Sequence, residues 1–553
     1  MTSADAQTGF RSRSRQAIEA FLQSVVVLDD RPEMPTSHGP VADSATVSLT
    51  EPGYPQSTTP ADPATDRDPA GGPLDAAAVI AGFADIGSVC AVLSAARSPE
   101  FRARAVKAAR RADIVVLDWT IEGTVGDEAL AILQEILKSD DQGQRLRLIA
   151  VYTQGPDLNT IRDRVQGAID PFHEGHDVKL DGFRLSKGPL HIVVLAKEGI
   201  ASSSPELGIP TATDGGLANR LVEEFALMTG GLLWNAAIAG IATVRDNAHR
   251  ILAKFEKGLD PAYLGHRLML PHPPDAQEHV EEALGAEIVS VIEEHQPGSH
   301  ANLEAIGAWL TLREAEGLRL SEPFSFESSR DSVDAWCELL LGGVDAPGVA
   351  LPPNVGKAAL RKRATEPFVG DQEAAKRSDR GFAALLSLKT RYPGRVPRLT
   401  IGTVLRTGEP NEREYFLCLQ PKCDSVRLDT LTGFPLAPLI PLETAEVGGS
   451  GEDLRLIVEP EPDQWEHFGI ETKPSDLTIR FFEPNSTQRG GEVLASRDGV
   501  GFYFADDHGK QYWWIAEMKD EHALRVAGEV ASALARPGPN DSEWLRRARG
   551  PRE

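Results

Sequence analysis

Three aspartates stand where apolar segments of the chain end, and their side chains could bind a metal ion or attack a phosphoryl group. Asp29 and Asp30 directly follow the apolar run 24–28. Asp118 directly follows a second apolar run, 114–117. Mg²⁺ prefers oxygen ligands such as carboxylates, and a carboxylate is also a nucleophile that can form a covalent intermediate. If the two runs lie side by side in a parallel sheet, the three carboxylates meet at one edge.

Two further predicted strands, mostly apolar, end in residue types that suit the same chemistry. The run 146–152 ends at Thr153, and the run 191–196 ends at Lys197. A hydroxyl can form a hydrogen bond to a phosphoryl oxygen, and an ammonium group can neutralise its charge. The four strand ends therefore carry Asp-Asp, Asp, Thr and Lys in chain order.

This order of strand ends resembles that of the response-regulator receiver domain. The resemblance extends to Trp119, which follows Asp118 as in some receivers, and to Gly126, which falls where receivers place the glycine before their third helix. Apolar residues at helical spacing over 127–137 predict that helix. The resemblance implies an α/β fold with a doubly wound, parallel, five-stranded sheet of the flavodoxin-like type.

The resemblance also implies a role for each of these side chains. Asp118 would be the phosphoacceptor, Lys197 would pair with a phosphoryl oxygen, and Thr153 would bind the same group and act as the switch. Mg²⁺ is the cofactor that the resemblance implies. Its ligands would be three carboxylates and one backbone carbonyl oxygen, those of Asp29, Asp30, Asp118 and Thr120.

Three residues depart from the pattern of receivers. Gln154 follows the threonine where receivers usually have a small residue, and Glu198 follows the lysine where they usually have proline. Val194 stands three positions before the lysine, where receivers commonly have an aromatic residue that takes part in switching. The sequence therefore leaves open whether the domain accepts a phosphoryl group and how a signal leaves it.

Composition limits the classes of function. The chain of 553 residues carries a formal net charge of -25, which argues against the clustered positive charge that nucleic-acid binding needs. Its four cysteines predict neither a disulfide framework nor a four-cysteine zinc site. The uncharged stretch 225–244 is rich in Ala, Gly and Thr, which favours a buried helix over a membrane span. With no secretory signal visible, we expect a cytoplasmic protein.

Patterning along the chain predicts three regions. Residues 1–215 would form the receiver domain, interrupted at about 31–73 by an insertion rich in Pro, Ser, Thr, Ala and Asp that we expect to be disordered. Residues 216–395 are helical in pattern, and we expect the last receiver helix to continue into this region as far as about residue 257. Residues 396–553 predict a mixed, mainly β domain that closes with a helix.

One motif in the last region resembles an enzymatic site. Glu517 and Lys519 form a Glu-x-Lys motif similar to that of restriction-type nucleases, where carboxylates hold Mg²⁺. Asp506 and Asp507 lie upstream, as acidic residues do in those enzymes. Glu-x-Lys is common by chance, however, and the aspartate pair lies in a predicted turn. We therefore expect no enzymatic activity beyond the self-phosphorylation of Asp118.

The sequence as a whole predicts a phosphoacceptor signalling protein of a bacterial two-component phosphorelay, with a histidine kinase or a phosphotransfer protein as its partner. The chain also resembles the receiver-bearing components of phage-defence two-component systems such as Detocs, where a protein without a visible effector could act as a phosphate sink. Two alternatives stay open: a receiver-like scaffold that is not phosphorylated, and a defence effector with an unrecognised output in the C-terminal region. Receivers often dimerise, so a homodimer is also an open partner, but the sequence identifies neither the cognate kinase nor the oligomeric state.

Overall fold

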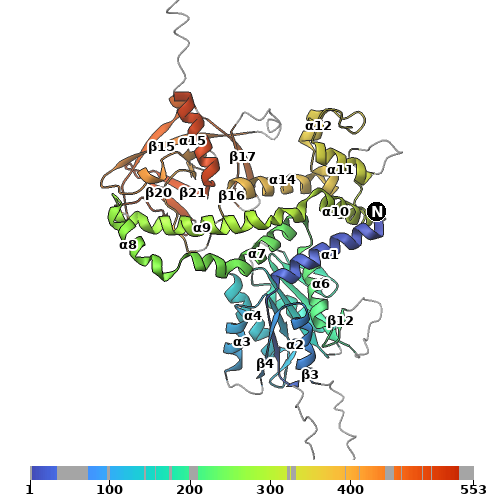
Figure 1. Cartoon of the computed structure of the whole chain (residues 1–553). Coiled ribbons are helices and arrows are strands. Elements are labelled where there is room, and N and C mark those ends of the chain that lie inside the picture. Colours follow the sequence, from blue (N-terminus) through green and yellow to red (C-terminus); the bar gives the residue numbers. More distant parts are fainter. Residues whose placement is uncertain are drawn as a thin grey trace, which may run out of the picture. The chain divides into compact units, whose positions relative to one another are not determined.

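The structure is a computed structural model of the chain, and it divides into two compact units (Figure 1). The first unit comprises Met1–Leu252 and Glu287–Trp309, and the second comprises Ala253–Ala286 and Leu310–Glu553. Each unit has its own sheet and its own hydrophobic cores, while the division of the sequence into three regions remains a prediction. The residues that the structure describes are 3–33, 73–95, 100–141, 145–155, 157–172, 177–198, 210–320, 324, 332–390, 392, 394–409, 412–442, 454–461, 464–471, 473–487, 490–499 and 501–534.

The first unit is built around an eight-stranded sheet whose central part is parallel. The five parallel strands lie in the spatial order β4, β1, β5, β8, β11, which is the 2-1-3-4-5 order of flavodoxin-like sheets. The Val, Ile and Leu runs of β1, β5, β8 and β11 suit strands that are buried on both faces, whereas the edge strand β4 is partly exposed. The predicted receiver fold is confirmed. The bounds are β1 Ser24–Asp29, β4 Val89–Ser94, β5 Ile114–Leu117, β8 Arg147–Thr153 and β11 Leu190–Lys197.

Helices cover both faces of this sheet (Figure 1). Successive residues of a strand point to opposite faces. In β1, Val26 and Leu28 therefore pack in the core that α3, α4 and α5 cover, whereas Val25 and Val27 pack with α1, α2 and α6. The helix predicted over 127–137 is present as α4. The bounds are α1 Ser3–Phe21, α2 Ala76–Asp85, α3 Phe101–Ala109, α4 Asp127–Asp141, α5 Leu158–Ile169 and α6 Leu217–Thr229.

Short strands extend the parallel core. β10 (Arg184–Lys187) and β9 (Lys179–Asp181) continue the sheet beyond β11 in antiparallel orientation, and β12 (Thr211–Ala212) pairs with the end of β11. After β5 the chain forms a tight hairpin from β6 (Thr120–Ile121) and β7 (Thr124–Val125). The hairpin and β12 both lie beside strand ends that carry candidate site residues.

The predicted insertion leaves and re-enters the fold through a two-stranded parallel pair. β2 (Pro32–Glu33) pairs with β3 (Leu74–Asp75), and α2 begins directly after β3. The helix cannot begin earlier than Ala76, because Leu74 and Asp75 pair with β2 and the Asp75 carboxylate caps the helix by accepting the Ala78 N–H. Residues 34–72, on which the expectation of disorder falls, lie outside the described residues.

The prediction of one continuous helix after residue 216 is wrong. α6 ends at Thr229, and α7 (Leu232–Lys254) begins after a break. Gly230 ends α6 in an extended conformation with ψ of 91°, where its missing side chain suits the close approach of the Ala226 carbonyl. In the part of the chain that the structure describes, no helix is long and apolar enough to cross a membrane.

The region predicted to be helical is helical in the structure. Its apolar residues recur at irregular intervals between Pro and Gly breaks, which produces several short helices and one long one. The bounds are α8 Asp260–Met269, α9 Ala276–His295, α10 Leu303–Ala315, α11 Ser332–Gly342, α12 Lys357–Lys362, α13 Glu366–Val369 and α14 Gln372–Ser387.

The second unit contains a nine-stranded antiparallel sheet, as the mainly β prediction requires. Its order is β16, β17, β15, β14, β13, β21, β20, β19, and β18 pairs with β15. The closing helix α15 packs against one of its two cores through Ala523, Val526 and Val530. The bounds are β13 Thr403–Thr407, β14 Glu414–Cys418, β15 Thr432–Pro441, β16 Arg455–Glu461, β17 Gln464–Ile470, β18 Thr478–Phe482, β19 Ser496–Arg497, β20 Phe502–Ala505, β21 Gln511–Glu517 and α15 Asp520–Leu534.

Candidate functional site

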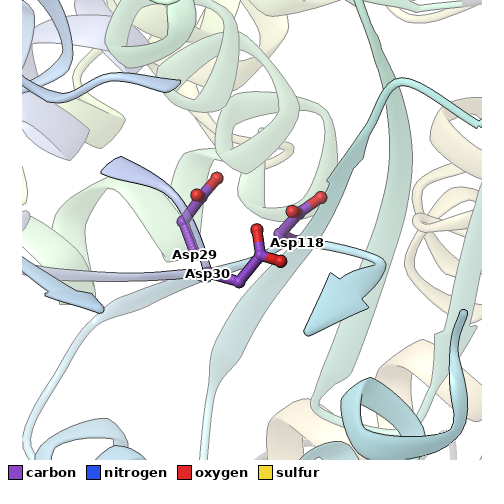
Figure 2. Close-up of side chains that lie close together, drawn as sticks. All are labelled: Asp29, Asp30 and Asp118. Carbon is purple, nitrogen blue, oxygen red and sulfur yellow. The ribbon is translucent and has the colours of Figure 1, made fainter. Parts of the chain in front are cut away.

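The three aspartates meet at the carboxyl edge of the parallel sheet. Asp29 is the last residue of β1, Asp30 follows it, and Asp118 follows β5, the neighbour of β1 (Figure 2). The Asp118 N–H donates to the Leu28 carbonyl at 2.9 Å, which continues the pairing of the two strands up to the site. One carboxylate oxygen from each aspartate lies within 4.8 Å of the others. This set of hard oxygen donors fits a cation such as Mg²⁺.

Lys197, the last residue of β11, reaches the same edge. Its Nζ lies 3.5 Å from Asp29 Oδ2, and both side chains are buried. On another side, the Nζ lies 5.2 Å from the centre of the Tyr152 ring. The structure therefore brings together four of the predicted site residues, three acidic and one basic.

Thr153 lies at the end of β8, between the strands that carry Asp118 and Lys197. Its side chain is only 2% exposed, and its hydroxyl oxygen accepts the Gly155 N–H at 2.9 Å. A hydroxyl that accepts one hydrogen bond still has a proton to donate. Thr153 is therefore placed at the right edge of the sheet and takes part in a local turn there.

The chain after Asp118 is held by a buried tryptophan. Trp119 is 3% exposed, and its carbonyl accepts the Gly126 N–H at 2.9 Å across the β6–β7 hairpin. Gly126 has a φ of 85°, and a Cβ at this position would overlap the Trp119 ring. The Arg164 guanidinium covers the same ring at 5.0 Å. These contacts fix the chain on both sides of the hairpin and so fix the start of α4.

The electrostatic environment of the three carboxylates favours the binding of a cation. Burial raises the pKa of Asp118 from 3.8 to about 7, against the opposing effect of Lys197, and the neighbouring charges of Asp29 and Asp30 raise it further. The Thr120 N–H, which donates to the Asp118 carboxylate, also opposes the shift. Burial likewise raises the pKa of Asp30. A bound divalent cation would relieve this repulsion and favour the ionised carboxylates.

The nuclease-like motif does not assemble a comparable site. Glu517 Oε1 pairs with Lys389 Nζ at 2.7 Å, and Lys519 Nζ donates to the Leu385 carbonyl at 2.6 Å. Asp506 accepts backbone N–H groups within its own turn. Among the residues that the structure describes, the aspartate trio is the only group of three or more candidate metal ligands.

Tyr152 is a site residue that the sequence reasoning did not single out. Its hydroxyl lies 2.8 Å from Asp214 Oδ1 and 3.0 Å from the Ala212 carbonyl, and its ring faces Lys197. The one signal that could have indicated it is an aromatic residue at the end of the aliphatic run 148–151, directly before Thr153. Its contacts join residues far apart in the chain and were not predictable.

Comparison with known proteins agrees with this geometry. Residues 21–202 match a family model described as a response receiver domain. The match spans all five parallel strands, and therefore every aspartate, threonine and lysine of the site. No curated protein and no solved structure matches the chain. The N-terminal part of the chain is thus a response receiver domain, a class that points to signalling by phosphoacceptance and to kinases or phosphotransfer proteins as partners.

Proposed function

We propose that this chain is a phosphoacceptor signalling protein of a two-component pathway, in which a histidine kinase or a phosphotransfer protein phosphorylates Asp118. The observation that carries the proposal is the grouping of three carboxylates within 4.8 Å, with Lys197 Nζ 3.5 Å from Asp29, at the carboxyl edge of a receiver sheet. Ligands bind at this edge in doubly wound sheets generally.

The proposed reaction follows from the placement of these groups. A carboxylate oxygen of Asp118 attacks the phosphorus, the bond from phosphorus to the donor nitrogen or oxygen breaks, and an acyl phosphate forms. Lys197, whose Nζ lies 3.5 Å from Asp29 Oδ2, would neutralise one phosphoryl oxygen. Mg²⁺ would supply charge neutralisation for the transferred group. The proposed ligands are the carboxylates and the carbonyl oxygen already considered for the sequence, those of Asp29, Asp30, Asp118 and Thr120.

Two of the residues that depart from the receiver pattern, Val194 and Glu198, make contacts that bear on how a signal leaves the domain. Val194 is fully buried in the core on the α4 and α5 side, so this position provides no aromatic ring that could switch. The Glu198 N–H donates to the Ala212 carbonyl at 3.0 Å, a bond that a proline could not make. We propose that Thr153 remains the group that binds the phosphoryl oxygen, and that the signal leaves through contacts other than an aromatic switch.

Phosphorylation can be tested directly. We expect the purified protein, incubated with acetyl phosphate and Mg²⁺, to give a shifted band on a phosphate-affinity gel that hydroxylamine removes, as it removes acyl phosphates. Asp118→Asn should abolish the shift. Asp181→Asn, the same change at a carboxylate that is 91% exposed, should leave it intact.

Two results would contradict the proposal. The absence of a shift in the unsubstituted protein would favour the receiver-like scaffold. A shift that survives Asp118→Asn would place the phosphoryl group elsewhere. A role in phage defence, or as a phosphate sink, is a finer hypothesis. It predicts that the phosphorylated protein drains phosphate from its kinase without changing any activity of residues 216–553.

A further inference from the structure

Tyr152 and Lys197 lie on the same face of the sheet, although they come from different strands. Tyr152 is paired with Leu195 across β8 and β11, and Lys197 is two residues beyond Leu195. Because every second residue of a strand points to the same face, the ring and the ammonium group meet diagonally at the strand ends. The Nζ lies 5.2 Å from the ring centre, within the range of a cation–π interaction.

The ammonium group of Lys197 is held between the ring and a carboxylate. Its distance of 3.5 Å from Asp29 Oδ2 is longer than the 2.7–2.9 Å of a charge-assisted hydrogen bond. The Lys197 side chain is 9% exposed, so little water is available to solvate its charge. The face of the Tyr152 ring offers a diffuse negative potential instead, and it does not compete with a phosphoryl oxygen for the N–H donors.

The ring itself is tethered. The Tyr152 hydroxyl donates toward Asp214 Oδ1 at 2.8 Å, and burial together with Asp214 raises the pKa of Tyr152, which keeps the hydroxyl protonated as a donor. Asp214 Oδ2 accepts the Asp75 N–H at 2.8 Å, and the Asp75 carboxylate caps α2. The ring is thus held by a chain of hydrogen bonds that ends at a helix N-terminus and at the base of the insertion.

We propose that Tyr152 is a positioning residue for phosphoryl transfer, whose ring face holds the Lys197 ammonium group in place for a phosphoryl oxygen. The inference rests on the proposed function and adds a residue to its site. Tyr152 does not touch the reacting atoms, and it acts through Lys197. Its electron-rich face, rather than its volume, is the property that matters.

A series of fluorinated rings tests the inference. Position 152 would carry phenylalanine, then phenylalanine with one, two and three fluorines, which withdraw electron density from the ring face while nearly preserving its shape. The measurement is the rate of Asp118 phosphorylation by acetyl phosphate in the full chain at fixed Mg²⁺. We expect the rate to fall stepwise, by about tenfold in total, which corresponds to about 1.4 kcal/mol.

Two matched series separate positioning from packing. Phe183 is also buried and also lies beneath a cation, with the Arg162 guanidinium 5.8 Å from its ring centre. The same fluorinated residues at Phe183 should leave the rate unchanged. In a Lys197→Met background, the series at position 152 should be flat, because the group through which the ring acts is gone.

If the protein is phosphorylated at the same rate with every ring at position 152, the inference about Tyr152 is overturned and the proposed function is not. A slope that persists in the Lys197→Met background also overturns the inference, since the ring would then act by another route. Absence of phosphorylation in the unsubstituted protein overturns the proposed function, and with it the inference that rests on it.

Discussion

The raised pKa of Asp118 makes the stability of the first unit depend on pH in a way that one substitution should remove. The pKa of this carboxyl is about 7 in the fold, against 3.8 as its ordinary value, chiefly because of burial. The folded state therefore binds the proton of Asp118 more tightly than the unfolded state does. The stabilisation that this proton provides is complete below pH 3.8 and is lost as the pH rises through about 7.

The magnitude follows from the size of the shift. One pKa unit corresponds to about 1.36 kcal/mol, so ionisation of the half-buried Asp118 destabilises the fold by at most about 4 kcal/mol. Between pH 5 and pH 8 the loss amounts to about 2 to 3 kcal/mol, since the unfolded carboxyl is already ionised at pH 5. Asp118→Asn has no charge to lose in this range. Its free energy of unfolding relative to that of the unsubstituted protein should therefore rise by about 2 to 3 kcal/mol from pH 5 to pH 8.

The assay is urea-induced unfolding without Mg²⁺. Unfolding is monitored by hydrogen exchange of the peptides that contain β1 and β5, so that only the first unit is observed. Asp181→Asn serves as the control, because that carboxylate is 91% exposed, and it should show no such dependence on pH. Saturating Mg²⁺ at pH 8 should narrow the gap, because the cation stabilises only the protein that retains the carboxylate. A gap that is equal at both pH values would refute the reasoning, since Asp118 would then be ionised throughout.

Three further predictions concern the same unit. Gly126→Ala should lower the free energy of unfolding in urea by about 2 to 3 kcal/mol, because Gly126 has a positive φ and a Cβ there would overlap Trp119. Gly123→Ala, at a position with a positive φ but open space, should lower it by about 1 kcal/mol, and equal losses would contradict this reasoning. Arg147→Met should lower the free energy of unfolding by about 3 to 5 kcal/mol, because it leaves the carboxylate of Asp140 buried without its partner. Adding Asp140→Asn to the same chain should restore part of this free energy, and no restoration would argue against the ion pair. Mg²⁺ affinity, measured by calorimetry, should rise as the pH passes through about 7 and Asp118 loses its proton. An affinity independent of pH would contradict a protonated Asp118 that must ionise before it binds the ion.

The parallel sheet was predictable because four of its five parallel strands, β1, β5, β8 and β11, are buried on both faces. Such strands require continuous apolar runs, and a polar residue directly after each run marks the carboxyl edge. The run 114–117 coincides with β5, and the runs 24–28, 146–152 and 191–196 agree with β1, β8 and β11 within one or two residues. Since the carboxyl ends of parallel strands share one edge, the order of the strand-end residues was enough to predict the candidate site.

One strand of the antiparallel sheet in the second unit is not predictable from its local sequence. The local pattern does not predict β15, because Pro435, Pro438 and Pro441 interrupt its sequence and prolines argue against a central strand. In the structure the proline carbonyls still accept hydrogen bonds: Pro435 from the Leu419 N–H at 2.9 Å, and Pro438 from the Glu471 N–H at 3.1 Å. Partner strands supply the donors, so the strand is specified by segments far away in the chain.

The residue types at the carboxyl edge of the first sheet follow from the sequence, because local apolar patterns identify the buried strands and the residue after each strand. Three properties depend on the three-dimensional packing instead: the pKa of Asp118, the contact of Lys197 with the Tyr152 ring, and the hydrogen bond from that ring's hydroxyl to Asp214. These properties depend on distances of a few ångströms and on the exclusion of water by packing between segments remote in sequence. No local pattern specifies either of them.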